Sequence, residues 1–154
     1  MRYLPACSGL LLLLATGAVS ADYDRGAAAY AAGDYETAYR LLEPMAEAGH
    51  PEAQLRVGAM HEWGQGVAPS FNKAAQWYQR AAAQGHPEAQ FTMGFMYGSG
   101  TGVTQDEVHA WAWFDLAARQ GDQKAREFRD ATGARLGAGK VAEAQRLSAR
   151  LRAD

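Results

Sequence analysis

The sequence has little of three things: cysteine, β-branched aliphatic side chains and net charge. Cys7 is the only cysteine among 154 residues, so an internal disulfide framework and a cysteine-ligated metal site are excluded. Isoleucine is absent and valine is scarce, which argues against a β-sandwich or a parallel sheet. A formal net charge of −2 is too small to suggest nucleic acid as a partner. What is abundant is alanine (33 residues) and glycine (17 residues), and this composition favours helices.

A long apolar run occurs only near the start of the chain. Residues 1–21 combine a positive start at Arg2, five consecutive leucines and a small-residue cleavage site ending at Ala21. This pattern is typical of a cleaved signal peptide, and the run is shorter than the ~20 residues of a membrane-spanning helix, the alternative interpretation. Cys7 precedes the apolar run instead of following it, so we do not expect a lipoprotein cleavage site. We expect a periplasmic or secreted protein with no stable membrane insertion after cleavage.

The body of the chain repeats with a period of 36 residues. Residues 49–84 and 85–120 align without a gap and share 16 identities, beginning with the same Gly-His-Pro-Glu-Ala-Gln segment. Gly121 opens a further copy of this start, and a partial unit with a shorter inter-helix loop precedes residue 49. Tandem units of this length indicate a repeat architecture in which each unit stacks on its neighbours.

Each repeat is expected to form two helices. Pro51 and Pro87 suit the first turn of a helix, where the missing N–H removes no hydrogen bond. The second helix carries alanine and tryptophan at spacings of three and four residues, which places them on one face. Gly58 and Gly94 recur in the middle of the first helix, and we interpret them as sites where a neighbouring helix approaches closely. Trp77, with its copy 36 residues later, would fill the space between helices.

The shared residues resemble the Sel1-like repeat. The matching pattern is Ala-x-x-x-x-Gly-x-Met, then Gly-x-Gly-Val, then Ala-x-x-Trp-[Tyr/Phe]-x-x-Ala-Ala-x-x-Gly, and residues 53–85 and 89–121 carry it in full. The earlier unit, with Gly-Asp-Tyr-Glu at residues 33–36, is more similar to a tetratricopeptide repeat. The resemblance implies an all-α fold, an α/α solenoid (superhelix) of helical hairpins, with a concave face that binds proteins or peptides.

Four parts of the chain follow from these observations. They are a signal peptide (1–21), an N-terminal tetratricopeptide-like unit (22–48), two Sel1-like repeats (49–121) and C-terminal capping helices (122–154). In the last part we expect a helix over 122–132 that is broken by Gly133, Gly137 and Gly139. A charged amphipathic helix over 140–152 would then cap the array, because terminal repeats need a polar outer side.

We expect no catalytic residues, no cofactor and no metal. The four histidines have no spacing that predicts convergence on an ion, because two of them share a repeat position in a turn and a third occupies a packing position; they are His50, His86, His61 and His109. The glycine-rich segments 64–66 and 98–102 connect two helices, whereas a phosphate-binding loop follows a strand and carries Lys-Ser/Thr.

A binding surface is the main functional expectation. By analogy with tetratricopeptide repeats, certain first-helix positions face the concave groove, and here they form a largely apolar, partly aromatic strip. The candidate residues are Tyr23, Tyr30, Leu55, Ala59, Glu62, Phe91 and Phe95. The alternative is that these side chains are half-buried between units or beneath the C-terminal helix.

Charge is distributed unevenly along the chain. Residues 22–118 hold 5 basic and 12 acidic side chains, whereas residues 119–154 hold 9 basic and 5 acidic ones. The basic tail could meet an anionic partner or membrane surface, or it could be a solvated helix face that only caps the array.

These features predict a non-enzymatic scaffold or adaptor of the bacterial cell envelope that binds a protein or peptide through its concave face. One alternative is an enzyme, because some secreted Sel1-like proteins with cysteine-rich repeats resemble penicillin-binding or β-lactamase proteins. The absence of repeat cysteines disfavours that reading. The other alternative is a secreted factor that binds host or competitor proteins.

Overall fold

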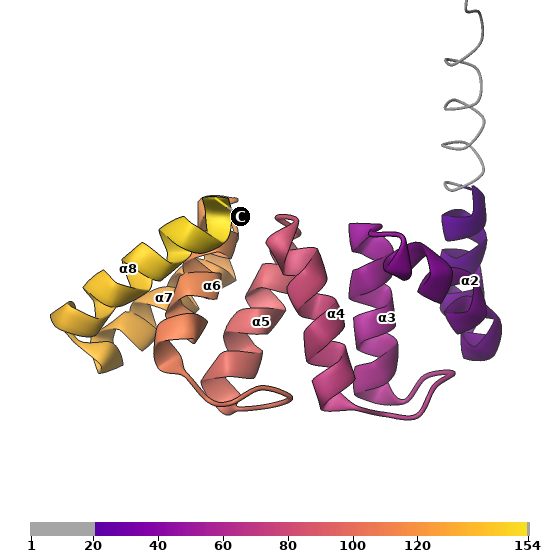
Figure 1. Ribbon diagram of the computed structural model, residues 1–154, viewed down its shortest axis with the longest axis horizontal. Coiled ribbons are helices and arrows are strands. Elements are labelled where there is room, and N and C mark those ends of the chain that lie inside the picture. Colours follow the sequence, from indigo (N-terminus) through magenta and orange to yellow (C-terminus); the bar gives the residue numbers. More distant parts are fainter. Residues whose placement is uncertain (1–20, 154) are drawn as a thin grey trace, which may run out of the picture.

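The computed structural model describes residues 21–153, and all regular elements within this range are helices. Residues 21–31 are helical, and the elements that follow are α2 (Tyr35–Glu47), α3 (Pro51–Trp63), α4 (Phe71–Ala83), α5 (Pro87–Ser99), α6 (Glu107–Arg119), α7 (Gln123–Leu136) and α8 (Ala138–Ala153). Helical hairpins follow one another along the long axis of the molecule, from residues 21–31 to α8 (Figure 1). The predicted all-α solenoid is confirmed. The expected signal peptide, with Cys7, lies outside the described residues except for Ala21.

Polar side chains begin the first helices of three successive hairpins. His50, His86 and Asp122 each accept a hydrogen bond from the backbone N–H three residues later, which satisfies a donor that the helix leaves free. Pro51 and Pro87 follow two of these caps, as the sequence predicts. The expectation that both histidines are exposed in turns is wrong, because the capping role leaves them partly buried.

The two mid-helix glycines lie where an aromatic ring of the second helix crosses the first. A β carbon at Gly58 would come within 2.8 Å of the Tyr78 ring, and one at Gly94 within 2.5 Å of the Phe114 ring. Glycine is less favourable than alanine in a helix by ~1 kcal/mol, and the close ring contact offsets that difference. The predicted reason for these glycines is therefore confirmed.

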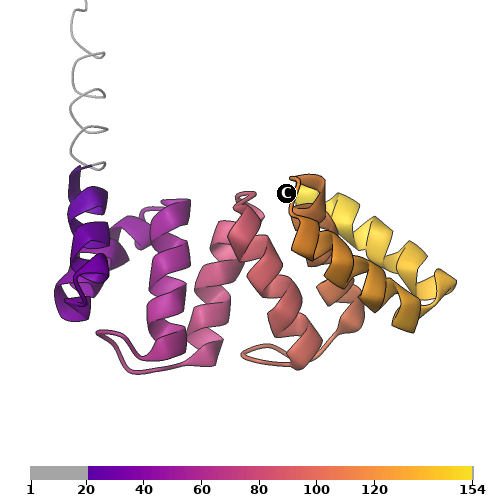
Figure 2. The same ribbon diagram turned by 180° about the vertical axis from the view of Figure 1, so that it is seen from behind.

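The loop between the two helices of a repeat packs on the preceding repeat. Gly66 and Gly102 both have positive φ angles, of 71° and 72°. A β carbon at Gly66 would overlap the backbone carbonyl of Tyr35, and one at Gly102 would overlap that of Phe71. Glycine is therefore required twice over, by the backbone angle and by the contact. Both loops lie along the same edge of the array (Figures 1 and 2).

A glutamine at the end of each second helix bonds back to the start of the first helix of the same repeat. Gln84 Nε2 donates to the Gly49 carbonyl oxygen at 2.9 Å and to Gln54 Oε1 at 2.8 Å. The Gln120 side chain makes the same two bonds one repeat later, both at 2.8 Å, with Gly85 and Gln90 as acceptors. Gln54 and Gln90 donate in turn to the carbonyl oxygens of Ala46 and Ala82 in the preceding unit, at 3.1 and 3.2 Å, so the paired glutamines connect successive hairpins.

The C-terminal end differs in one respect from the sequence prediction. The α7 helix runs through Gly133 and ends at Gly137, which has a φ of 77°, while Gly139 lies inside α8. Gly133 does not break α7 because it serves packing: a β carbon there would come within 2.9 Å of Trp111 Nε1. The α8 helix then packs chiefly on α6, where Ser148 Oγ donates to the buried carboxylate of Asp115 at 2.7 Å.

The loop of the N-terminal unit is shorter than the four residues expected from the sequence. Tyr35 and Glu36 already belong to α2, and Asp34 is its N-cap, which accepts from the Thr37 N–H at 3.1 Å. Gly33, with a φ of 79°, makes the turn. No helix among residues 21–153 combines the length and the apolar character needed to cross a bilayer.

Candidate functional site

The first helices of the hairpins form one face of the array. This first-helix face consists of residues 21–31, α3, α5 and α7, and it carries two cavities. The N-terminal cavity, of about 210 Å³, lies among residues 21–31, α3 and α5, with one side chain from α4. It is lined by Tyr30, Glu52, Leu55, Arg56, Ala59, Tyr78, Glu88 and Thr92. The cavity therefore combines an apolar floor with charged and hydroxyl groups at its edge.

The guanidinium of Arg56 is engaged by two tyrosines of the preceding helix. Its Nε donates to the Tyr23 hydroxyl oxygen at 3.0 Å, and the guanidinium carbon lies 5.6 Å from the centre of the Tyr30 ring. Donation of this hydrogen bond to Tyr23 raises the pKa of Arg56, so its charge is permanent. The Tyr30 hydroxyl donates in turn to Gln65 Oε1 at 2.8 Å. These contacts fix the aromatic wall of the N-terminal cavity.

The hydroxyl of Tyr78 reaches the cavity from the second helix of the repeat. It donates to Glu62 Oε2 at 2.6 Å. Burial, together with the hydrogen bond to Glu62, raises the pKa of Tyr78 far above its ordinary value. Tyr78 therefore stays neutral, keeps its proton on this bond and holds the Glu62 carboxylate in place.

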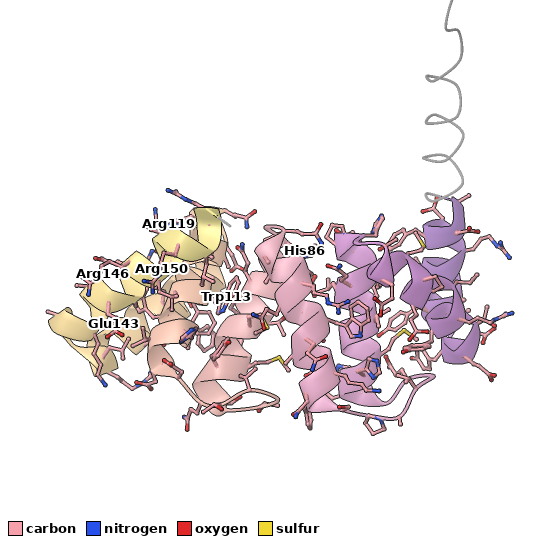
Figure 3. All side chains as sticks on the ribbon, viewed as in Figure 1. His86, Trp113, Arg119, Glu143, Arg146 and Arg150 are labelled. Atoms are coloured by element: carbon pink, nitrogen blue, oxygen red, sulfur yellow. The ribbon has the colours of Figure 1, made fainter. Side chains whose placement is uncertain are left out.

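Two glutamates in equivalent positions of α3 and α5 have different environments. Glu52 Oε1 lies 3.0 Å from His86 Nε2, on the next repeat (His86 is marked in Figure 3). Because His86 Nδ1 accepts the Ala89 N–H, the neutral ring carries its proton on Nε2 and donates it to Glu52. At the following interface Asp122 replaces the histidine, so Glu88 faces no such donor. No ion pair among the described residues includes Glu88.

The C-terminal cavity is apolar and lies between α5 and α7. It measures about 240 Å³ and is lined by Gly94, Phe95, Gly98, Ser99, Phe114, Phe128, Thr132 and Arg135. Phe95 and Phe128, each 40% exposed, pack edge to face with ring centres 4.5 Å apart. Arg135 at the rim donates to Glu107 Oε1 at 2.9 Å. Two large exposed aromatic rings at a cavity are typical of an interaction surface.

A third cavity lies away from this face and involves the buried histidine. It is about 200 Å³, and its lining includes Tyr39, Glu43 and His61. The Tyr39 hydroxyl donates to Glu43 Oε1 at 2.6 Å and lies 3.3 Å from His61 Nε2. Burial lowers the pKa of His61, and burial with the Glu43 contact raises that of Tyr39. His61 is therefore neutral, and it occupies the packing position that the sequence predicts.

The seven candidate residues of the strip fall into four places. Tyr30, Leu55 and Ala59 line the N-terminal cavity, and Glu62 is bonded to the Tyr78 side chain beside it. Tyr23 stacks on His50 with ring centres 5.0 Å apart and accepts from Arg56, outside the cavity lining. The last two residues are Phe91, which is half-buried against the core alanines of α6 and α7, and Phe95, which lines the C-terminal cavity.

Several lining residues were not anticipated from the sequence. Tyr78 and Phe114 come from second helices. The sequence signal for them is that an aromatic residue follows the repeated tryptophan in both copies. Glu88 and Thr92 lie one helical turn apart on α5 and carry no sequence signal beyond the repeat alignment. Phe128 belongs to the capping region, where the repeat pattern stops.

The remaining charged groups give no second candidate site. Among residues 21–153 no group of three or more histidine, cysteine, aspartate or glutamate side chains is placed to hold a metal ion. At the C-terminal end Arg119, Arg146 and Arg150 gather on α6 and α8 (Figure 3). Arg119 Nε is bonded to Asp115 Oδ2 at 2.7 Å, so at least part of the basic surface has a structural role.

Comparisons with known proteins place this geometry in a family of helical repeats. A family model described as Sel1 repeat matches residues 9–50, 51–86 and 87–122. The first match includes the N-terminal unit, which the sequence likened to a tetratricopeptide repeat. A comparison with curated proteins finds no match.

Solved structures with the same repeat fold come from three bacteria. A protective antigen of uropathogenic Escherichia coli strains, with an SLR fold, superposes with a TM-score of 0.80 at 31% identity over 86% of this chain, which spans 29% of that protein. A Sel1 repeat protein from Oxalobacter formigenes gives 0.68 at 37% identity, over 75% of this chain and 90% of that one. Helicobacter pylori cysteine rich protein B gives 0.56 at 26% identity, over 58% and 68%.

Proposed function

The chain belongs to the Sel1 repeat family, and from this premise we propose that it is a non-enzymatic scaffold or adaptor that binds a protein or peptide through its first-helix face. In this proposal the first-helix face takes the role of the concave side that the resemblance implies. The proposal places the protein in the bacterial cell envelope or the medium, because residues 1–21 have the pattern of a secretory signal.

The observation that carries the proposal is the pair of cavities on one face. The N-terminal cavity has an apolar floor made by Leu55 and Ala59, and the C-terminal cavity has the exposed rings of Phe95 and Phe128. A buried aromatic or aliphatic anchor surrounded by polar groups is the usual centre of a protein interface. Repeat arrays stack their first helices into an extended surface of this kind.

Affinity capture tests the proposal by comparing the wild type with a variant whose first-helix face is altered. The tagged protein, expressed from the full chain, is incubated with an envelope extract, and a variant with Leu55→Ser and Phe95→Ser serves as the comparison. The matched control carries Glu36→Gln, at an exposed position on a second helix. Circular dichroism and thermal melting confirm that each variant is folded.

We expect one or more polypeptides that the wild type and the Glu36→Gln protein retain and that the double variant loses. Equal retention by all three proteins would place binding elsewhere and would contradict the proposal. Separation of periplasm, membrane and medium, followed by detection of the tag, tests the location: tagged protein confined to the cytoplasm would refute export.

The absence of enzymatic activity is tested with nitrocefin. We propose no turnover, because no serine with an adjacent base lines either cavity of the first-helix face. Hydrolysis above the buffer background by the purified protein, lost on substitution of a cavity residue, would establish the β-lactamase alternative instead.

A further inference from the structure

We propose that the first-helix face takes an extended polypeptide segment in which a lysine or arginine and a large apolar side chain are about three residues apart. The cation pairs with Glu88, and the apolar side chain enters the C-terminal cavity between Phe95 and Phe128. This inference rests on the proposed function and specifies the chemistry of the partner.

First, Glu88 has no ion-pair partner among the described residues. Its equivalent, Glu52, receives a hydrogen bond from His86, but the next repeat offers Asp122 in place of that histidine. The one cation that lines the N-terminal cavity, Arg56, is bonded to Tyr23 and lies over Tyr30. Arg56 makes no ion pair with Glu88, so Glu88 presents a carboxylate without an ion-pair partner at a cavity, where a cation from a partner would be stabilised.

The second step is the character of the C-terminal cavity. Phe95 and Phe128 are large apolar side chains that stay 40% exposed although they pack against each other. The rings of Phe91 and Phe114 support them from beneath, with Phe95 and Phe114 centred 5.4 Å apart and Phe91 and Phe128 5.9 Å apart. A supported, half-exposed aromatic pair beside a cavity of about 240 Å³ suits an aromatic or branched aliphatic side chain.

The third step is the spacing between the two groups. Glu88 and Phe95 lie on α5, seven residues apart, so they share one face. Seven residues of α-helix rise ~10 Å. An extended chain advances ~3.3 Å per residue, so a peptide lying along α5 places side chains about three residues apart at the two sites. Thr92 lies between them and is small enough to leave the path open.

A peptide titration tests the inference directly. The probe is a fluorescein-labelled peptide with a Lys-Ala-Ala-Phe core between Gly-Ser flanks, measured by fluorescence anisotropy against the purified protein expressed from the full chain. Matched peptides replace the lysine by glutamate, replace the phenylalanine by alanine, or reverse the core to Phe-Ala-Ala-Lys.

Two substitutions assign the contacts. Glu88→Gln is expected to weaken binding of the lysine peptide about two- to fivefold, the range of an exposed ion pair, and Glu36→Gln to leave it unchanged. Phe95→Ala is expected to weaken binding of the phenylalanine-containing peptides at least about tenfold, as for an interface anchor. Glu88→Lys keeps an exposed position exposed, so it folds even if Phe95→Ala does not, and it should reverse the preference toward the glutamate peptide.

The possible results separate this inference from the proposed function. Preference for the Lys-Ala-Ala-Phe peptide, reversed by Glu88→Lys, supports the inference. Equal binding of lysine and glutamate peptides, an unchanged preference in Glu88→Lys, or no measurable peptide binding overturns it. The proposed function fails independently, if the double variant at Leu55 and Phe95 captures the same envelope polypeptides as the wild type.

Discussion

The two full repeats, α3–α4 and α5–α6, can be compared position by position because 16 of their 36 residues are identical. The shared residues make the same contacts: a glycine under an aromatic ring, a glycine pair in the loop and a terminal glutamine that bonds to the start of its own repeat. These contacts hold the hairpins together. The residues that recur in both repeats therefore form the structural framework of the array, meaning the contacts that stack its helices.

The two repeats differ most on their first helices. The α3 helix presents Leu55 and Ala59, whereas α5 presents Phe91 and Phe95 at the equivalent positions. The pairing of the first-turn glutamate differs as well, because only Glu52 has a histidine partner. Duplication preserved what stacks the hairpins and changed what faces outward, so the differences locate recognition better than the identities do.

The largest expected effect comes from the buried carboxylate at the third interface. Asp115 is 2% exposed and accepts from Ser148, Arg119 and Arg129, whereas the equivalent residues in the earlier units are Glu43 and Gln79. Asp115→Ala should lower the free energy of unfolding by ~2–3 kcal/mol, because charge-assisted bonds are lost and the Ser148 hydroxyl stays buried.

Urea denaturation followed by circular dichroism measures this loss. Glu143→Ala, at an exposed carboxylate on α8, is the matched control and should change stability by less than ~0.5 kcal/mol. Equal effects of the two substitutions would show that Asp115 does not fasten α8 to the array.

The glycine contacts provide the next effect and compare the repeats directly. Gly94→Ala should destabilise the protein by ~1–2 kcal/mol and Gly58→Ala by less, because the Phe114 ring is nearer than the Tyr78 ring and overpacking exceeds the gain in helix propensity. Gly98→Ala, on the same helix as Gly94, meets only Ala110 at 3.8 Å and is expected to be neutral or stabilising.

Thermal and urea denaturation of the three variants check this order. Phe114→Leu combined with Gly94→Ala should recover part of the loss, since the smaller side chain can accommodate the new methyl group. A Gly94→Ala protein as stable as Gly98→Ala would show that the close ring contact is not what retains the glycine.

The glutamines that end the two repeats test whether the framework is the same in both. Gln84→Ala and Gln120→Ala each remove two hydrogen bonds of 2.8–2.9 Å and should each lower the free energy of unfolding by ~1 kcal/mol. Because the two bridges have the same geometry, the two losses should agree closely. A difference of more than ~1 kcal/mol between the variants would break the equivalence of the repeats.

The smallest effect is a pH dependence confined to the first repeat. Burial lowers the pKa of His61 in the folded state, so below its ordinary pKa of 6.5 the unfolded chain binds more protons than the folded one. Stability is therefore full above pH 6.5 and falls as the pH drops from there toward the folded-state pKa.

Melting temperatures measured between neutral and mildly acidic pH should show this fall, and His61→Gln should flatten the curve. The second repeat carries Tyr97 at the equivalent position and contributes no such slope. An identical pH profile in the wild type and the His61→Gln protein would contradict the assignment.

The sequence predicted the fold well because the residues that stack the hairpins occur in two copies. Glycines, prolines and alanines at a 36-residue offset indicate helix starts, loops and crossings without knowledge of the structure. The prediction failed where no second copy exists. Gly133 was expected to end a helix, but its close packing on Trp111 overrides the low helix propensity of glycine.

The candidate site was only partly predictable for the same reason. The analogy identified Tyr30, Leu55 and Ala59 together, and the structure places all three around one cavity. It could not identify Tyr78, because that ring reaches the cavity from a second helix. It could not show that Glu88 lacks a hydrogen-bond donor either. That depends on the side chain which the following repeat places opposite Glu88, and there Asp122 replaces the histidine.

The most direct test of the account is the map of amide chemical shifts when the protein binds the polypeptide recovered by affinity capture. Shifts concentrated on α3 and α5, around Leu55, Ala59 and Phe95, with α2 and the outer sides of α4 and α6 unchanged, are the predicted result. Shifts concentrated on the second helices or on α8, with those three residues unaffected, would contradict the claim that the first-helix face is the recognition surface.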